Sequence, residues 1–251
     1  MNLELQELLN SVEQATGYTV SVTTKEISTH ASFVSATPER PVHAVFINPK
    51  YAQWGDYLLA MQCSMILIKW KDITRIPDFS PDPQIVNNQI RNISGKMENI
   101  PAPAAQKFSS MLISGLLQQL NSIPIQMMAV EICRDRCPSL HRQQNESIQN
   151  ELREMTSVLD KKIQSTTPQE IFERCVAMNA AYSYHWAEVS GDASITLSYQ
   201  AAGFCAKGKE LLGAYKTIDP KSVTRYQETV DSWAGYLNLN GWYTWRYRSN
   251  R

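Results

Sequence analysis

Residues 42–69 read VHAVFINPKYAQWGDYLLAMQCSMILIK, a short β-rich run followed by a long apolar segment. The first seven residues are rich in Val, Phe and Ile, which is typical of a strand. The segment Tyr51–Lys69 carries large apolar side chains at helical spacing, namely Trp54, Tyr57, Leu58, Met61, Met65 and Ile68. We therefore predict a strand over Val42–Asn48 that leads into a buried helix.

The residues before this stretch predict one helix and two further strands. Leu5, Leu8 and Val12 recur at helical spacing, and Gly17 follows as a C-cap residue, so residues 3–16 should form a helix. Two β-rich runs then cover residues 18–23 and 29–35, and a Pro-containing turn separates the second from Val42. The expected order over residues 1–76 is therefore helix, three strands, helix.

The remainder of the chain divides into two parts. Residues 77–103 contain five prolines and few large apolar side chains, which predicts a linker with a short helix near residues 85–93. Residues 104–251 predict a mainly α-helical region that packs on the N-terminal core, with helices that begin near Ala104, Pro138, Thr167 and Asp219. The expected fold class is α+β.

Composition excludes several classes of function. Lys plus Arg and Asp plus Glu both number 24, so no global field attracts nucleic acid or anionic lipid. No apolar run reaches the roughly 18 residues that a membrane span needs. The five cysteines are an odd, scattered set, which favours reduced thiols and a cytoplasmic location.

The centre of the buried helix, Met61-Gln62-Cys63-Ser64-Met65, stands where a zinc peptidase would carry His-Glu-x-x-His. Two imidazoles four residues apart lie on one helix face and bind zinc, while the Glu activates water. Methionine is a poor zinc ligand, and a glutamine amide has no basic form at neutral pH. We therefore expect no metal and no cofactor at Met61, Gln62 and Met65.

The element order and a few residues of this segment resemble the ImmA/IrrE metallopeptidase family. Cys63 matches the cysteine of that family's His-Glu-Cys-Gly-His helix, whereas Met61, Gln62 and Met65 replace the His, Glu and His. The segment 105–112 resembles a later family helix, but alanines stand where its third metal ligand, a Glu, would precede it. The resemblance implies a degenerate zincin-like core over residues 1–76 that lacks every metal ligand.

Four other groups of residues could form sites, and each also has an ordinary structural explanation. Cys133, Cys137 and His141 have helical spacing, but Pro138 should begin a new helix between them. Gly203-x-x-x-x-Gly208-Lys209 resembles a phosphate loop after a predicted strand at 195–199, but Glu210 stands at the magnesium-binding position.

The two remaining groups are pairs of side chains that could exchange a proton. His185 and Glu188 lie three residues apart on a predicted helix, and Cys63 could act as a nucleophile with His43 or His30 as its base. A thiol at the centre of an apolar helix, however, has a raised pKa and is hidden from solvent.

Two functions from different classes follow. The first is a non-catalytic binding or regulatory protein on a degenerate metallopeptidase fold, whose partner is another protein or peptide. An edge strand, formed by Val42, Ala44, Phe46 and Asn48, would bind that partner by main-chain hydrogen bonds. Relatives in the resembled family imply a stress, mobile-element or phage-defence setting. The second is a hydrolase with a relocated metal or thiol site that uses His43, His185 or Glu188.

Overall fold

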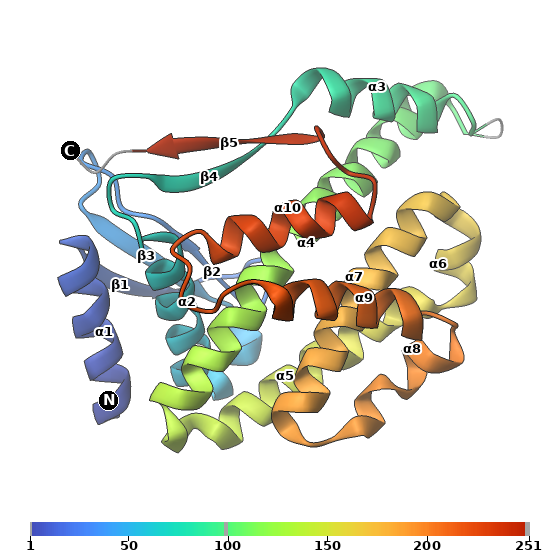
Figure 1. Cartoon of the computed structure of the whole chain (residues 1–251). Helices are drawn as coiled ribbons and strands as arrows, with labels where there is room; N and C mark the ends of the chain where they lie inside the picture. Colours follow the sequence, from blue (N-terminus) through green and yellow to red (C-terminus); the bar gives the residue numbers. More distant parts are fainter. Residues whose placement is uncertain (1, 98–99, 249–251) are drawn as a thin grey trace. The chain divides into compact units, whose positions relative to one another are not determined.

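The computed structural model describes residues 2–97 and 100–248, and the fold is α+β (Figure 1). The chain divides into two compact units. The first comprises the described parts of Met1–Pro77, Ile125–Glu151 and Tyr247–Arg251, and the second comprises the described parts of Asp78–Pro124 and Leu152–Arg246.

The first unit begins with the predicted order of a helix, three strands and a helix. Its elements are α1 (Leu3–Thr16), β1 (Thr19–Thr24), β2 (Ala31–Val34), β3 (Val42–Ile47), the 3-10 helix η1 (Pro49–Trp54) and α2 (Gly55–Lys69). The α1 helix ends at Gly17, whose φ of 76° is the left-handed conformation expected of a C-cap. The predictions of these elements are confirmed.

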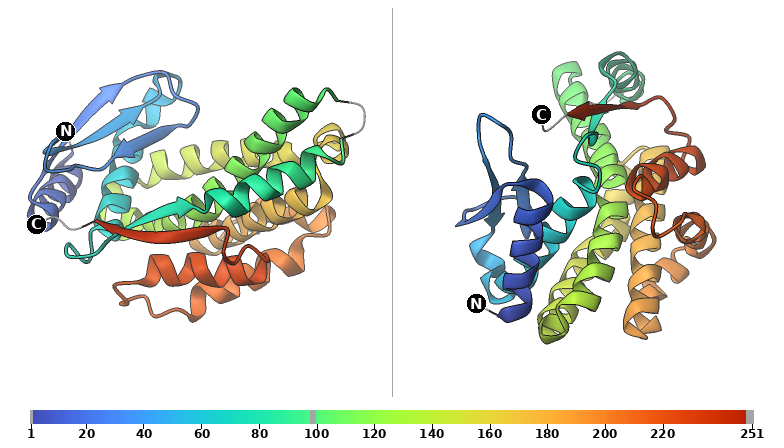
Figure 2. Two further views of the ribbon diagram at one scale, coloured as in Figure 1. Left: turned by 90° about the horizontal axis from the view of Figure 1, so that it is seen from above. Right: turned by 60° about the vertical axis from the view of Figure 1, so that its left-hand side comes forward.

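The strand order in this unit is β1-β3-β2, so β3 is the central strand. It pairs in parallel with β1, where Val22 lies opposite Val45, and antiparallel with β2, where Phe33 lies opposite Val45. The side chains of β3 alternate in burial, and His43, Val45 and Ile47 point to the buried face. Both α1 and α2 contact this sheet, and Figure 2 shows them on one side of it.

The first unit also contains a segment from later in the sequence. It consists of the last part of α4 (Ala102–Arg136), the 3-10 helix η2 (Pro138–Leu140) and the first part of α5 (His141–Thr156). The long helix α4 is divided between the units at Pro124, which lies inside it. The structure therefore divides the expected single region 104–251 between the two units. The sequence does not predict this boundary, because no change of composition marks residue 124.

The second unit contains the remaining helices and a two-stranded sheet. Its further elements are most of β4 (Ile76–Pro81), α3 (Pro83–Ser94), η3 (Ser157–Leu159), α6 (Lys161–Thr166), α7 (Gln169–Ser190), η4 (Ala193–Thr196), α8 (Leu197–Ala201), α9 (Cys205–Thr217), α10 (Arg225–Tyr236) and most of β5 (Tyr243–Arg248). Strand β4 pairs with β5, and the ring of Phe79 stacks on that of Tyr243 at 4.4 Å between centroids. The expected linker at 77–103 thus carries a strand and a helix, since Asp82 caps α3 and Pro83 fits its first turn.

The core of the second unit is built around α7. All residues from Val176 to Trp186 on this helix are buried, and its closest neighbour is α9. Trp233 of α10 is fully buried and donates its indole N–H to the carbonyl of Leu211 at 2.9 Å. Tyr243 and Trp245, in the aromatic stretch near the C-terminus, belong to strand β5.

Candidate functional site

The positions that correspond to a zinc peptidase site lie in the core of the first unit. Met61, Gln62 and Met65 are only 5%, 6% and 7% exposed, and all ten residues of α2 from Tyr57 to Ile66 are buried. A helix that is buried all round packs against other elements on every side.

The residues that cover α2 come from the later segment of the first unit. The hydroxyl of Ser64 lies 3.4 Å from the sulfur of Cys133 on α4, and the backbone N–H of Tyr57 donates to the side chain of Gln143 on α5. Packing by α4 and α5 thus fills the region beside α2. Met61, Gln62 and Met65 have neither a zinc-binding group nor exposure.

The prediction that Val42, Ala44, Phe46 and Asn48 form an edge strand is wrong. Strand β3 has hydrogen-bonded neighbours on both sides, so a partner strand has no free edge to pair with there. Val42, Ala44 and Phe46 instead project from the half-exposed face of the sheet. Asn48 caps the helical turn η1 and donates its side-chain amide to the carbonyl of Ile27.

His43 is a structural residue of the first unit. Its ring is fully buried, accepts a hydrogen bond from the N–H of Ala36 at 3.1 Å and lies 3.1 Å from the hydroxyl of Thr16. That hydroxyl already donates to the carbonyl of Val12, so Nε2 of His43 must carry the proton. Burial, together with the charge of Arg40, lowers the pKa of His43 to about 4, which keeps the ring neutral.

The cysteine and histidine groups also have ordinary structural places. Burial raises the pKa of Cys63 and of Cys133 to about 12, so neither thiol is activated. Pro138 begins η2 and separates Cys137 from His141, as the sequence predicts. Within the described ranges, no three His, Cys, Asp or Glu side chains converge as metal ligands.

Neither the apparent phosphate loop nor the His185–Glu188 pair forms a site in the structure. Residues 195–199, predicted as a strand, are helical, and Gly208 lies inside α9 rather than in a loop. His185 is buried, whereas Glu188 forms an ion pair with Lys216 at 2.6 Å.

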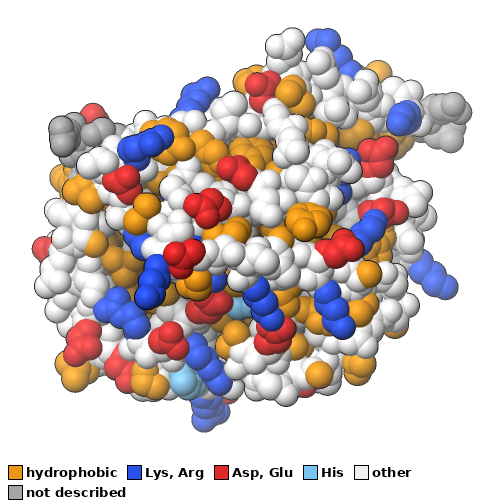
Figure 3. Space-filling model, in the orientation of Figure 1, with side chains coloured by type: hydrophobic (Ala, Val, Ile, Leu, Met, Phe, Trp, Pro, Cys, Tyr) orange, Lys and Arg blue, Asp and Glu red, His pale blue; other side chains and the backbone are white. Residues whose placement is uncertain are grey.

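Charged side chains of both signs are interspersed on the face drawn in Figure 3. Among the described residues, no helix is long and apolar enough to cross a membrane.

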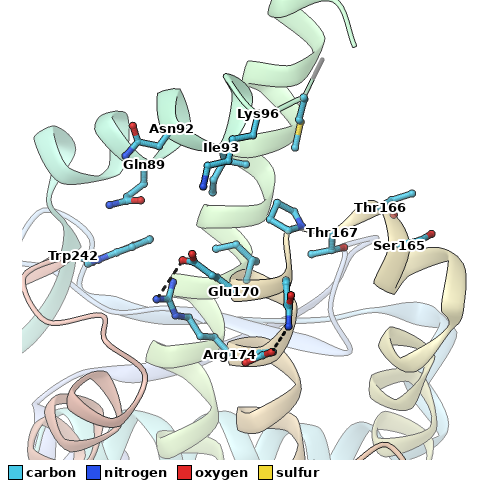
Figure 4. A pocket seen from close by; sticks show the side chains of 15 residues that line it. Gln89, Asn92, Ile93, Lys96, Ser165, Thr166, Thr167, Glu170, Arg174 and Trp242 are labelled. Atoms are coloured by element: carbon cyan, nitrogen blue, oxygen red, sulfur yellow. Dashed lines mark hydrogen bonds and ion pairs between the residues drawn. The ribbon is translucent and has the colours of Figure 1, made fainter. Parts of the chain in front are cut away.

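The second unit contains a cavity of about 840 Å³ that the sequence does not predict (Figure 4). It lies between α3 with the residues that follow it, which provide Gln89, Asn92, Ile93, Lys96 and Met97, and the segment 165–174 that leads into α7. Trp242 closes one side. Most of the lining side chains are polar, and Ile93, Met97, Ile171 and Trp242 add apolar surface.

The start of α7 is the first polar feature of this cavity. Its N-cap residue is Pro168, which makes no side-chain hydrogen bond to the first turn. Pro168 does accept from the N–H groups of Ile171 and Phe172 through its carbonyl. The N–H groups of Gln169 and Glu170 therefore have no capping side chain, and the positive end of the helix dipole lies at the cavity wall.

Arg174 is the second polar feature. Its guanidinium carbon lies 5.6 Å from the centroid of the Trp242 ring, and its side chain is 17% exposed. Glu170 faces it at 3.8 Å, but that carboxylate is 76% exposed. A carboxylate at this distance engages few of the five N–H donors of a guanidinium, so Arg174 can bind a further anion. Glu173 also acts on Arg174 by its charge, but that carboxylate is paired with Lys207.

The other acidic residue in the wall, Glu173, is paired with Lys207, which does not line the cavity. Lys207 donates to Glu173 at 2.7 Å and Gln169 donates to it at 2.9 Å. These hydrogen bonds, first that of Lys207, lower the pKa of Glu173. The arrangement favours an anionic group beside an apolar one, and no local sequence signal identifies it because its walls come from distant segments.

The chain matches no family model, and no curated protein and no solved structure resembles it significantly. The resemblance to the ImmA/IrrE family therefore stays a prediction, based on element order and a few residues.

Proposed function

We propose that this protein is a non-catalytic binding protein that recognises another protein or peptide through a carboxylate group. The observation that carries the proposal is the cavity in the second unit, where the uncapped start of α7, Arg174 and Trp242 converge. A helix N-terminus and a guanidinium are both donors suited to a carboxylate.

The apolar side of the cavity indicates what accompanies the carboxylate. Ile93, Met97 and Trp242 form a wall next to the amides of Gln89 and Asn92. A peptide that ends in an apolar residue would place its terminal carboxylate at α7 and Arg174 and its last side chain against this wall. Backbone N–H groups and an adjacent apolar pocket are a recurrent means of binding a chain terminus.

The non-catalytic part of the proposal is supported by the chemistry of α2. Met61, Gln62 and Met65 offer neither a zinc ligand nor a general base, and they are buried. The family resemblance supports a regulatory role in a stress, mobile-element or phage-defence setting. The central strand β3 offers no free edge to a partner strand, so the proposed binding site is the cavity of the second unit.

The test is affinity selection of peptides on the immobilised full-length protein. One random peptide library ends in a free carboxylate, and a matched library ends in an amide. We expect enrichment from the first library alone, and we expect Arg174→Met to abolish it because the guanidinium is lost. The control variant Arg91→Met removes an exposed arginine of α3 that does not line the cavity.

Two results would contradict the proposal. The first is equal enrichment from both libraries, which would show that the carboxylate is not recognised. The second is unchanged enrichment with Arg174→Met, provided that circular dichroism shows the variant to be folded.

A further inference from the structure

Cys205 is the first residue of helix α9, and its side chain is half-exposed. The preceding residue, Phe204, makes no side-chain hydrogen bond to the first turn of the helix. The N–H groups of that turn and the helix dipole therefore act on the thiol without a competing cap. A helix N-terminus stabilises a thiolate relative to a thiol.

The close approach of α9 to α7 brings a second helix against this turn. A Cβ atom added at Gly208 would lie only 2.7 Å from the Cβ of Ala180 and 3.2 Å from Cδ2 of Tyr184. A glycine at this position thus allows α9 to pack directly on α7. The contact places the ring of Tyr184 beside the first turn of α9.

Tyr184 carries a buried hydroxyl close to Cys205. The residue is 7% exposed, and no acceptor meets its hydroxyl with ordinary hydrogen-bond geometry. A buried donor without a well-formed hydrogen bond costs free energy. An anion beside this hydroxyl could accept its hydrogen bond and remove that cost.

The environment of Cys205 lowers the pKa of its thiol. The largest cause is the neighbouring hydroxyl of Tyr184, which stabilises the thiolate form, and the charge of Lys209 acts in the same direction. Lys209 lies one helical turn after Cys205, with its amine 5.5 Å from the centroid of the Tyr184 ring. The pKa of Tyr184 is raised to about 12, so its hydroxyl keeps its proton at neutral pH.

The other four cysteines have the opposite property. Burial raises the pKa of Cys63, Cys133 and Cys175 to about 12, and it also raises the pKa of Cys137. Within this chain, Cys205 therefore combines access with the conditions that favour a thiolate.

We propose that Cys205 is a thiol-modification site that forms mixed disulfides with small anionic disulfides. The thiolate of Cys205 attacks one sulfur of the disulfide, a new sulfur–sulfur bond forms, and the original one breaks. Cys205 is oxidised, and the departing half is reduced and leaves as a thiolate. The start of α9 and Lys209 are positive, so they attract a negatively charged disulfide and stabilise the departing anion.

The experiment treats the full-length protein with oxidised glutathione, which is anionic, and separately with cystamine, which is cationic. Peptide mass spectrometry then follows each cysteine with time. We expect Cys205 to react at least about ten times faster than the other four, because the thiolate is the reacting form. Relative to a free cysteine peptide, its rate with glutathione disulfide should rise more than its rate with cystamine.

Variants of Tyr184 and Lys209 test whether these side chains act on the thiol of Cys205 or only support the structure. Tyr184 and Lys209 are the titratable groups that act on the thiol. Tyr184→Phe and Lys209→Met should each move the midpoint of the pH–rate profile of Cys205 upward, whereas Lys209→Arg should retain the wild-type midpoint. Lys162→Met, which removes an exposed lysine of α6, is the matched control.

The proposal would be overturned by similar rates at all five cysteines or by an equal acceleration with cystamine. An unchanged midpoint in Lys209→Met would overturn it as well. Lys209 is exposed, so its variant should fold and can decide the question even where Tyr184→Phe does not fold.

Discussion

The buried histidine of the first unit should make the stability of that unit strongly dependent on pH. In the folded protein the pKa of His43 is lowered from 6.5 to about 4, first by burial and then by the charge of Arg40. The unfolded chain binds a proton below pH 6.5, whereas the folded chain does not do so until about pH 4. The contribution of His43 is therefore present in full above pH 6.5 and is lost as the pH falls to about 4.

The magnitude follows from the difference between the two pKa values. Each pKa unit corresponds to about 1.4 kcal/mol, so the loss between pH 6.5 and pH 4 is roughly 3 kcal/mol. This is a large part of the 5–15 kcal/mol that is typical of the stability of a folded protein. The variant His43→Asn removes the titration, while its side-chain oxygen can still accept from the N–H of Ala36.

The assay is urea denaturation at several values between pH 7 and pH 4, with hydrogen exchange of the β3 amides as a local measure of the first unit. The free energy of unfolding should fall by roughly 3 kcal/mol more in the wild type than in His43→Asn over this range. His141→Asn, which removes a less buried histidine, should retain the wild-type dependence. Parallel pH profiles for the wild type and His43→Asn would refute the reasoning.

Three further predictions follow from the same structure. Purified protein without an affinity tag should contain well under one zinc per chain by elemental analysis, because Met61 and Met65 are poor zinc ligands. A chelator should therefore leave its melting temperature unchanged. Stoichiometric zinc that resists dialysis would instead favour the hydrolase. Trp233→Ala should lower the free energy of unfolding of the second unit by about 3–5 kcal/mol, since it leaves a cavity and removes the hydrogen bond from the indole to the carbonyl of Leu211. The exposed Tyr236→Ala is the control, and an equally small loss in both would contradict this role of Trp233. Phe46→Pro should unfold the first unit by circular dichroism, because it removes an N–H donor from the central strand; a variant with an unchanged melting temperature would be inconsistent with the strand order.

The local elements could be predicted from the sequence because their signals are local. The spacing of Leu5, Leu8 and Val12 and the glycine at position 17 predict α1, and the apolar residues after Thr167 predict α7 up to Gly191. Strand order has no comparable signal. Residues 18–48 contain three short strands of similar composition, and only long-range pairing makes β3 the central one.

The candidate sites were harder to predict for the same reason. The ligand positions on α2 could be judged from residue type alone, since Met61, Gln62 and Met65 lack the necessary groups wherever they lie. Arg174 and Trp242, in contrast, are separated by a long stretch of chain and meet only through tertiary packing. Pro168 was visible as the start of a helix, but its lack of a capping group becomes informative only when the cavity beside it is known.

The proposed binding site is tested most directly by hydrogen–deuterium exchange of residues 165–174. The measurement compares the free protein with the protein saturated by a peptide selected from the free-carboxylate library. A bound carboxylate would accept hydrogen bonds from the uncapped N–H groups of Gln169 and Glu170, so we predict slower exchange in this turn and no change in Arg174→Met. Saturable binding of the peptide without protection of this turn would contradict the account.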